Sequence, residues 1–171
     1  MFHVVTGGSG SGKSAFAEQC ILDCQGNNRI YIATMYPFDE ESHRRIARHR
    51  AMRAEKKFTT IERYTDLEHL TIPQGADVLL ECMSNLTANE IYRPDGAGEQ
   101  TADSIVDGVE ELCSRCEHVV IVTNEVCSEC TRDSADMIRY KKILSEVNRR
   151  LAQKADWVTE VVYGIPVEVK R

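Results

Sequence analysis

The feature that most constrains this sequence is the octapeptide Gly7-Gly8-Ser9-Gly10-Ser11-Gly12-Lys13-Ser14, which fits the pattern G-x-x-x-x-G-K-[ST] at every position. Residues 2–6 before it have the apolar character of a buried strand, and residues 15–19 after it are typical of a helix. In this setting, glycines let backbone N–H groups converge on phosphate oxygens, and the helix N-terminus adds partial positive charge. The octapeptide therefore predicts a phosphate-binding loop; the alternative is a flexible Gly/Ser turn.

Two side chains of this loop point to nucleotide chemistry. Lys13 is expected to reach the β- and γ-phosphates of a nucleoside triphosphate, and the Ser14 hydroxyl to complete the coordination shell of Mg²⁺. The whole loop is predicted to bind nucleotide through its eight residues: Gly7, Gly8, Ser9, Gly10, Ser11, Gly12, Lys13 and Ser14.

Length and composition indicate one domain spanning residues 1–171. With 171 residues, of which 42% are hydrophobic and 28% charged, the chain can bury a substantial core. A formal net charge of −6 argues against a nucleic-acid-binding surface and against a polybasic membrane-binding surface. No apolar run approaches the roughly 20 residues of a membrane span, and the first strand leaves no room for a signal peptide, so we expect a cytoplasmic protein.

Seven cysteines include the pairs Cys113/Cys116 and Cys127/Cys130, a spacing that is compatible with zinc. An apolar strand predicted at residues 118–123 separates the pairs by about 20 Å. Four thiolates on one zinc ion lie within about 4 Å of each other. Separate thiols are therefore expected; a shared zinc site and a reversible Cys127–Cys130 disulfide remain as alternatives.

Apolar strands alternate with helical segments along the chain, which predicts a mainly parallel sheet covered by helices on both faces. A pair of strands joined by a Gly164-Ile165-Pro166 turn ends the chain as a β-hairpin. The expected fold class is an α/β P-loop NTPase of the RecA-like type, with ligands at the carboxyl ends of the strands. We expect strands near residues 2–6, 29–33, 58–61, 77–81, 118–123, 157–162 and 167–169, and helices near 13–24, 39–54, 84–92, 101–113 and 134–155.

The strongly charged helix at residues 39–54 carries a second candidate constellation. Arg45, His49 and Arg53 are spaced by four and share one helix face. The two arginines favour a bound anion such as a nucleotide polyphosphate, and they favour a neutral His49, which suits a nucleophile. The alternative is a solvated basic helix; His43, on a different face, is expected at the surface.

These motifs together resemble the bifunctional adenosylcobinamide kinase/adenosylcobinamide-phosphate guanylyltransferase family, and the resemblance runs nearly end to end. The segments that carry it are Gly7-Gly8-x-x-Ser11-Gly12-Lys13-Ser14, Tyr31-Ile32-Ala33-Thr34, Arg45-Ile46-x-x-His49-x-x-x-Arg53, Leu79-Leu80-Glu81-Cys82 with Asn89, Val122-Thr123-Asn124-Glu125-Val126, Val147-Asn148-x-x-Leu151-Ala152-x-x-Ala155-Asp156 and Gly164-Ile165-Pro166-Val167-x-Val169-Lys170. After residue 126, relatives usually carry a glycine-rich run, whereas this chain has Cys127-Ser128-Glu129-Cys130-Thr131-Arg132.

The resemblance implies two reactions on a corrinoid partner, adenosylcobinamide. The first transfers the γ-phosphoryl group of ATP or GTP, with Lys13, Mg²⁺ and Glu81 stabilising charge. The second transfers GMP from GTP through a phosphoramidate on His49. The same resemblance implies a homo-oligomer, specifically a trimer, and a GTP site lined by further residues: Ala33, Thr34, Met35, Arg50, Ala51, Met52, Arg53, Glu62 and Glu81. Arg45 is added to the predicted nucleotide-binding residues because it shares the helix face of His49 and Arg53.

Two other functions remain open from the sequence. One is a phosphate-loop kinase for another small alcohol, in which His49 only contacts phosphate. The other is a non-catalytic GTP-binding relative that acts as a sensor or a partner subunit.

Overall fold

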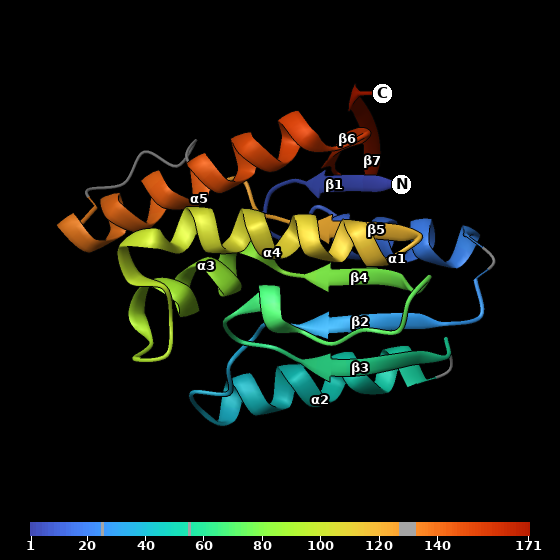
Figure 1. Cartoon of the computed structure of the whole chain (residues 1–171), viewed down its shortest axis with the longest axis horizontal. Coiled ribbons are helices and arrows are strands. Elements are labelled where there is room, and N and C mark those ends of the chain that lie inside the picture. Colours follow the sequence, from blue (N-terminus) through green and yellow to red (C-terminus); the bar gives the residue numbers. More distant parts are fainter. Residues whose placement is uncertain (25, 55, 127–132) are drawn as a thin grey trace.

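The computed structural model describes residues 1–24, 26–54, 56–126 and 133–171, without the side chains at positions 45, 49 and 52–54. These residues form one seven-stranded sheet in the order β3-β2-β4-β5-β1-β6-β7 (Figure 1). Neighbouring strands are parallel except β6 and β7, which confirms the mainly parallel sheet and the C-terminal β-hairpin. The strands are β1 (Phe2–Thr6), β2 (Arg29–Ala33), β3 (Phe58–Glu62), β4 (Asp77–Glu81), β5 (His118–Val122), β6 (Trp157–Val162) and β7 (Ile165–Lys170).

Among the described residues, five α-helices connect and cover the strands, and their order along the chain agrees with the sequence-based expectation. Two short 3₁₀ turns, Leu67–His69 and Gly98–Gln100, were not expected. The helices are α1 (Lys13–Asp23), α2 (Glu40–Ala54), α3 (Met83–Tyr92), α4 (Thr101–Arg115) and α5 (Ala135–Lys154).

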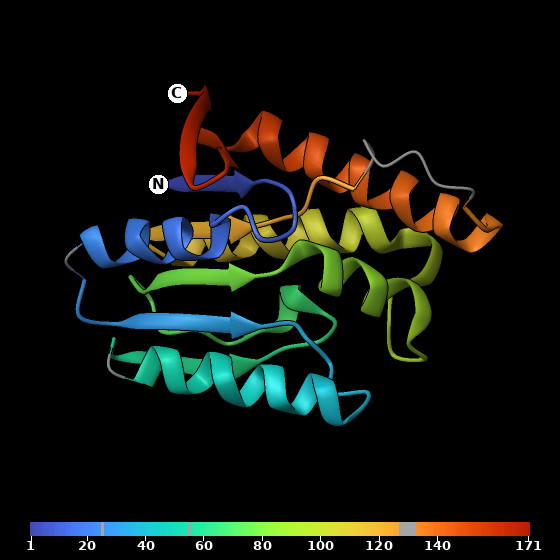
Figure 2. The same cartoon turned by 180° about the vertical axis from the view of Figure 1, so that it is seen from behind.

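The alternation of side chains along the strands divides the core between the two faces of the sheet. Val5, Leu79 and Val120 pack with Ile21 of α1 on one face. Residues one position away along the same strands pack with α3, α4 and α5 on the other face. Figure 1 shows α4 and α5 in front of the sheet, and Figure 2 shows α1 in front when the molecule is seen from behind. Helices therefore cover both faces, as predicted.

The turn of the C-terminal hairpin differs from the prediction. It is formed by Tyr163 and Gly164, with φ angles of 49° and 79°, and β7 begins at Ile165 rather than at Val167. Pro166 pairs with Val161 within the hairpin. Proline is typical of turns, but the edge strand β7 accommodates Pro166 because one side of an edge strand needs no N–H donor.

The topology brings the carboxyl ends of the parallel strands to one edge of the sheet. β1 lies between β5 and β6, and the predicted phosphate loop leaves its carboxyl end to enter α1. The carboxyl ends of β2, β4 and β5 lie on the same edge, because Ala33 is in register with Glu81 and Glu81 with Val122. This edge is where an open parallel sheet places a ligand.

Candidate functional site: a pocket over the phosphate loop

The phosphate loop has a backbone that side chains would not tolerate at key positions. Gly7 and Gly12 have φ angles of 152° and 93°, in the region that favours glycine. A Cβ atom at Gly7 would lie 2.5 Å from the carbonyl oxygen of Val161. The hairpin also supports the loop directly, since the Gly164 N–H donates to the Ser11 carbonyl oxygen at 2.8 Å. The loop conformation therefore depends on both its own glycines and the distant C-terminal hairpin.

Lys13 is held across this loop. Its side chain is nearly covered, with 8% of the residue exposed, and its Nζ donates to the Gly8 carbonyl oxygen at 2.9 Å. Burial lowers the pKa of the Lys13 ammonium, while the nearby Cys82 and Glu81 act in the opposite direction. The arrangement places a partly desolvated positive charge above the loop N–H groups, where it can pair strongly with phosphate oxygens.

Ser14 and Glu81 form a pair of hard oxygen ligands beside Lys13. The Ser14 hydroxyl donates to Glu81 Oε1 at 2.5 Å, and the Tyr31 hydroxyl donates to Glu81 Oε2 at 3.0 Å. These side chains come from the start of α1, the end of β4 and the middle of β2. Hydroxyl and carboxylate oxygens suit Mg²⁺, which uses one or two protein oxygens together with phosphates and water. The donor set therefore fits the predicted metal.

A pocket of about 290 Å³ lies over the loop and joins it to other elements. Eight of the predicted nucleotide-binding residues line it: Ser9, Gly10, Lys13, Ser14, Ala33, Met35, Arg50 and Glu81. Eight further lining residues were not predicted: Tyr31, Ile46, Thr60, Cys82, Ser84, Asn85, Val122 and Asn124. Most of these unpredicted residues lie at the carboxyl ends of strands or just after them. Ligands of open parallel sheets bind at this edge, and that rule could have predicted these residues.

Thr34 lies behind the pocket wall. It is fully buried, and its Oγ1 both donates to the Cys82 carbonyl oxygen and accepts from the Cys82 N–H, each at 2.8 Å. The Asn89 side-chain amide donates to the Thr34 carbonyl oxygen at 2.8 Å. In this structure Thr34 connects the ends of β2 and β4 to α3, so it fixes the spacing of the pocket wall.

Helix α2 forms the outer side of the pocket through Ile46 and Arg50. Arg50 makes an ion pair with Glu62, which brings two of the predicted GTP-site residues together. Ala51 and His43 are exposed, which agrees with the surface position expected for His43. The side chains of Arg45, His49, Met52 and Arg53 lie outside the described part of the structure, so their predicted roles stay predictions.

The backbone of α2 nevertheless locates position 49. It is three residues after Ile46 and immediately before Arg50, on the helical turn that contributes both of these pocket residues. In an α-helix, residues three and four apart lie on neighbouring positions of one side.

Five of the seven cysteines lie in the part of the chain that the structure describes. Cys20, Cys24, Cys82, Cys113 and Cys116 are free thiols there. Burial raises the pKa of Cys113 to about 11, so this thiol stays protonated near neutral pH. Cys127 and Cys130, with the rest of residues 127–132, lie outside the described residues, and the zinc and disulfide alternatives are not tested.

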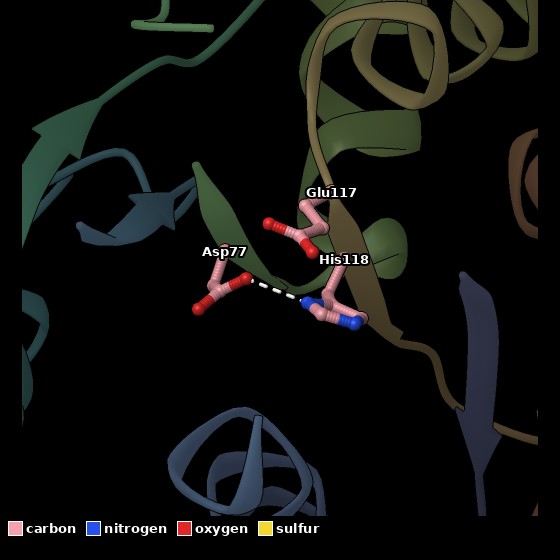
Figure 3. A group of neighbouring side chains, drawn as sticks. All are labelled: Asp77, Glu117 and His118. Carbon is pink, nitrogen blue, oxygen red and sulfur yellow. Dashed lines mark hydrogen bonds and ion pairs between the residues drawn. The ribbon is translucent and has the colours of Figure 1, made fainter. Parts of the chain in front are cut away.

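A second polar group lies at the opposite edge of the sheet, where β4 and β5 begin (Figure 3). Asp77 is 1% exposed, and its Oδ1 accepts from His118 Nδ1 at 2.7 Å. Glu117 completes a group whose potential ligand atoms lie within 4.8 Å of one another. The second Asp77 oxygen points away from Glu117 and His118 in Figure 3. This geometry favours a structural hydrogen-bonded pair that joins two strands.

Among the described residues, every helix is too short or too polar to span a lipid bilayer.

Three features define the class of protein to which this chain belongs: the central position of β1, the glycine-dependent loop after it, and the oxygen ligands at the ends of neighbouring strands. The chain is a P-loop nucleotide-binding protein of the α/β type. Its residues 3–169 match the family described as cobinamide kinase/cobinamide phosphate guanyltransferase. The chain belongs to this family, whose members are enzymes with kinase and nucleotidyltransferase activities.

Three named relatives support this assignment along the full length of the chain. It is 35% identical to the bifunctional adenosylcobalamin biosynthesis protein CobU of Escherichia coli (strain K12), covering 99% of this chain and 100% of that protein. The CobU protein of Salmonella typhimurium is 34% identical, with the same coverage. The bifunctional adenosylcobalamin biosynthesis protein CobP of Pseudomonas aeruginosa is 28% identical, covering 99% of this chain and 98% of that protein.

Among solved structures, the flagellar accessory protein FlaH from Methanocaldococcus jannaschii matches with a TM-score of 0.48 and 10% sequence identity. The match covers 98% of this chain and 77% of FlaH. Family membership rests on the sequence matches.

Proposed function

We propose that this protein phosphorylates adenosylcobinamide with ATP or GTP and then transfers GMP from GTP to the product, giving adenosylcobinamide-GDP. The family and the named relatives support this function. The observation that carries it is a single pocket lined both by Lys13 and Ser14 of the phosphate loop and by Ile46 and Arg50 of α2. Nucleotide phosphates bound on the loop would then lie next to the helix that carries His49.

In the kinase reaction, the loop N–H groups and Lys13 hold the β- and γ-phosphates, and Lys13 exchanges its bond to Gly8 for phosphate oxygens. Ser14 and Glu81 would hold Mg²⁺, which neutralises charge on the phosphates. The hydroxyl oxygen of the aminopropanol arm of adenosylcobinamide attacks the γ-phosphorus, and the bond to the bridging oxygen of the nucleoside diphosphate breaks. The hydroxyl proton leaves to solvent.

In the guanylyl transfer, a ring nitrogen of His49 attacks the α-phosphorus of GTP. The bond to the bridging oxygen breaks, and pyrophosphate leaves with that electron pair. A phosphate oxygen of adenosylcobinamide phosphate then attacks the same phosphorus, and the N–P bond breaks to restore His49. Arg50 lines the pocket and would offset negative charge on the phosphates, and Arg45 and Arg53 on the same helix are proposed to contribute likewise.

Labelling with GTP tests this function directly. Wild-type protein incubated with α-³²P GTP and Mg²⁺ should acquire a label that is lost in acid and kept in alkali, as expected for a phosphoramidate. His49→Ala should lose the label, whereas His43→Ala should keep it because His43 is exposed on another side of the same helix. An unlabelled wild type, or equal labelling of His49→Ala, would overturn the guanylyltransferase assignment and leave the kinase for another alcohol or the non-catalytic GTP-binding protein.

The cytoplasmic location and the homotrimer are parts of the same proposal. The homotrimer rests on the family resemblance of the sequence, and the cytoplasmic location is supported by the biosynthetic role in the names of the relatives.

A further inference from the structure

A cluster of aromatic side chains lies beside the nucleotide pocket, at the same edge of the sheet. Its members are Tyr36 and Phe38, after β2, Tyr64, after β3, and Arg93, whose guanidinium lies over the rings of Tyr36 and Tyr64. The ring centroids of Tyr36 and Phe38 are 4.9 Å apart, and those of Tyr36 and Tyr64 are 5.1 Å apart. Both pairs are edge-to-face, which is a favourable arrangement of aromatic rings. We call these four side chains the aromatic cluster.

The aromatic cluster is held in a fixed arrangement. The guanidinium carbon of Arg93 lies 4.2 Å from the ring centroid of Tyr36 and 5.9 Å from that of Tyr64, within the range of cation–π attraction. Asp95 anchors Arg93 through two hydrogen bonds of 2.9 and 3.0 Å. Hydrogen bonding to Asp95 raises the pKa of Arg93, so the guanidinium stays charged. A rigid surface of this kind loses little conformational freedom when a ligand binds.

Direct contacts link the aromatic cluster to the pocket. Met35, which lines the pocket, is the residue before Tyr36. On the other side, the Tyr64 hydroxyl donates to Glu62 Oε2 at 2.8 Å, and Glu62 pairs with the pocket residue Arg50. A ligand that extends out of the pocket past Arg50 would therefore meet these rings.

The cluster also presents an apolar surface to solvent. Phe38 is 76% exposed, although its ring is packed edge-to-face on Tyr36. Tyr36 and Tyr64 are half-buried, and Arg93 lies over one face of the Tyr36 ring. An exposed phenylalanine on a supported aromatic base, next to a ligand pocket, has the character of a binding subsite.

We propose that the aromatic cluster binds the corrin macrocycle of the acceptor substrate while its phosphorylated or hydroxyl arm reaches into the pocket. This inference rests on the proposed function. A pocket of about 290 Å³ suits a nucleotide-sized ligand, so a macrocycle must lie outside it. The macrocycle has apolar, methyl-bearing faces that suit Phe38 and Tyr36, and amide arms at its rim that suit the Tyr64 hydroxyl and the Arg93 guanidinium.

The competing occupant is the base of the nucleotide, since aromatic rings also stack on guanine. Removing a ring distinguishes the two occupants. If the corrin macrocycle binds the cluster, the affinity for adenosylcobinamide falls; if the guanine base binds it, the affinity for GTP falls. Phe38→Ala is the main test because its exposure leaves the fold unaffected. Phe38→Trp is the conservative variant, because it keeps an aromatic face. Val169→Ala is the matched control, because Val169 is also exposed (62%) but lies beside the start of β6, at the opposite edge of the sheet.

The experiment measures adenosylcobinamide binding by equilibrium dialysis, with the visible absorbance of the corrinoid as readout. Phe38→Ala should raise the dissociation constant for adenosylcobinamide by about 5- to 100-fold, as for loss of one stacking ring. Phe38→Trp and Val169→Ala should stay within about twofold of wild type. Labelling by GTP and GTP affinity should be unchanged in all three variants.

A wild type that binds no adenosylcobinamide would overturn both the inference and the proposed function, whereas the other outcomes distinguish the two. The inference is also overturned if Phe38→Ala binds adenosylcobinamide as tightly as the wild type, or if Phe38→Ala loses affinity for GTP instead. If the wild type binds but does not turn over adenosylcobinamide, and Phe38→Ala binds it weakly, the subsite stands and the proposed function fails. If the wild type turns over adenosylcobinamide and Phe38→Ala binds it normally, the proposed function stands and the subsite inference fails.

Discussion

At the scale of single residues, the phosphate loop concentrates its function in Lys13. Its ammonium is nearly buried and is bonded only to a neutral carbonyl in the hydrogen bonds described, so phosphate is the stronger partner. Lys13→Ala should weaken binding of GTP and ATP by about 10- to 100-fold, the range of a charge-assisted hydrogen bond. Isothermal titration calorimetry measures this change, with Lys56→Ala, whose side chain pairs with Glu18, as the control. Unchanged affinity would contradict the phosphate-loop assignment.

The residue scale also shows what local sequence could predict. The loop, Lys13 and Ser14 follow from a contiguous pattern whose strand–loop–helix setting can be read from the same 20 residues or so. Tyr31 and Thr34 could not be assigned in this way, because their roles depend on partners about 50 residues away, at Glu81 and Cys82. Such contacts exist only once β2 and β4 are paired in register.

At the scale of elements, α5 offers a test of how a helix start is stabilised. Ser134 precedes the helix in an extended conformation, and its Oγ accepts the Met137 N–H at 3.2 Å. Ser134→Ala should lower the free energy of unfolding by about 0.5–2 kcal/mol, because the N–H loses its partner. Urea denaturation measures this change, and Ser134→Asp should retain most of the stability. A loss below about 0.3 kcal/mol would show that water replaces the cap.

Element boundaries were predicted well where apolar runs meet polar turns, as at β4 and β6. The start of β7 was wrong because Pro166 is compatible with both a turn and an edge strand. The spacing of Arg45, His49 and Arg53 predicted a shared face of α2, but periodicity does not say which face meets the sheet. Ile46 and Arg50 show which turn of α2 reaches the pocket.

At the scale of the whole molecule, one buried histidine links stability to pH. His3 is 5% exposed; its ring packs against Phe16 and Trp157, and its Nε2 lies 2.9 Å from Thr159 Oγ1. Burial lowers the pKa of His3, so the unfolded chain binds its proton at a higher pH than the folded chain. Stability from neutral His3 is therefore complete above the unfolded pKa of about 6.5 and declines as the pH falls towards the folded pKa.

This linkage predicts a pH slope that one substitution removes. Between pH 7.5 and 5.5 the free energy of unfolding should fall by at most about 1.4 kcal/mol per pH unit through His3. His3→Gln should lose this component, and exposed His43→Gln should keep it. Denaturant titrations followed by Trp157 fluorescence and circular dichroism measure the slope. If residues 1–171 form a single domain, as proposed, the two signals should change together; identical slopes in wild type and His3→Gln would contradict the linkage.

The place of β1 in the sheet has a consequence for how this protein is made. β1 leaves the ribosome before the other six strands of this sheet, yet both of its neighbours, β5 and β6, lie more than a hundred residues later in the chain. The turn after β6 supports the phosphate loop. Pairings so distant in sequence form slowly, because a long loop must close before they contribute. A nascent chain therefore carries the whole phosphate-loop sequence long before it can hold a nucleotide, and nucleotide binding reports that the sheet has folded as far as the β6–β7 hairpin.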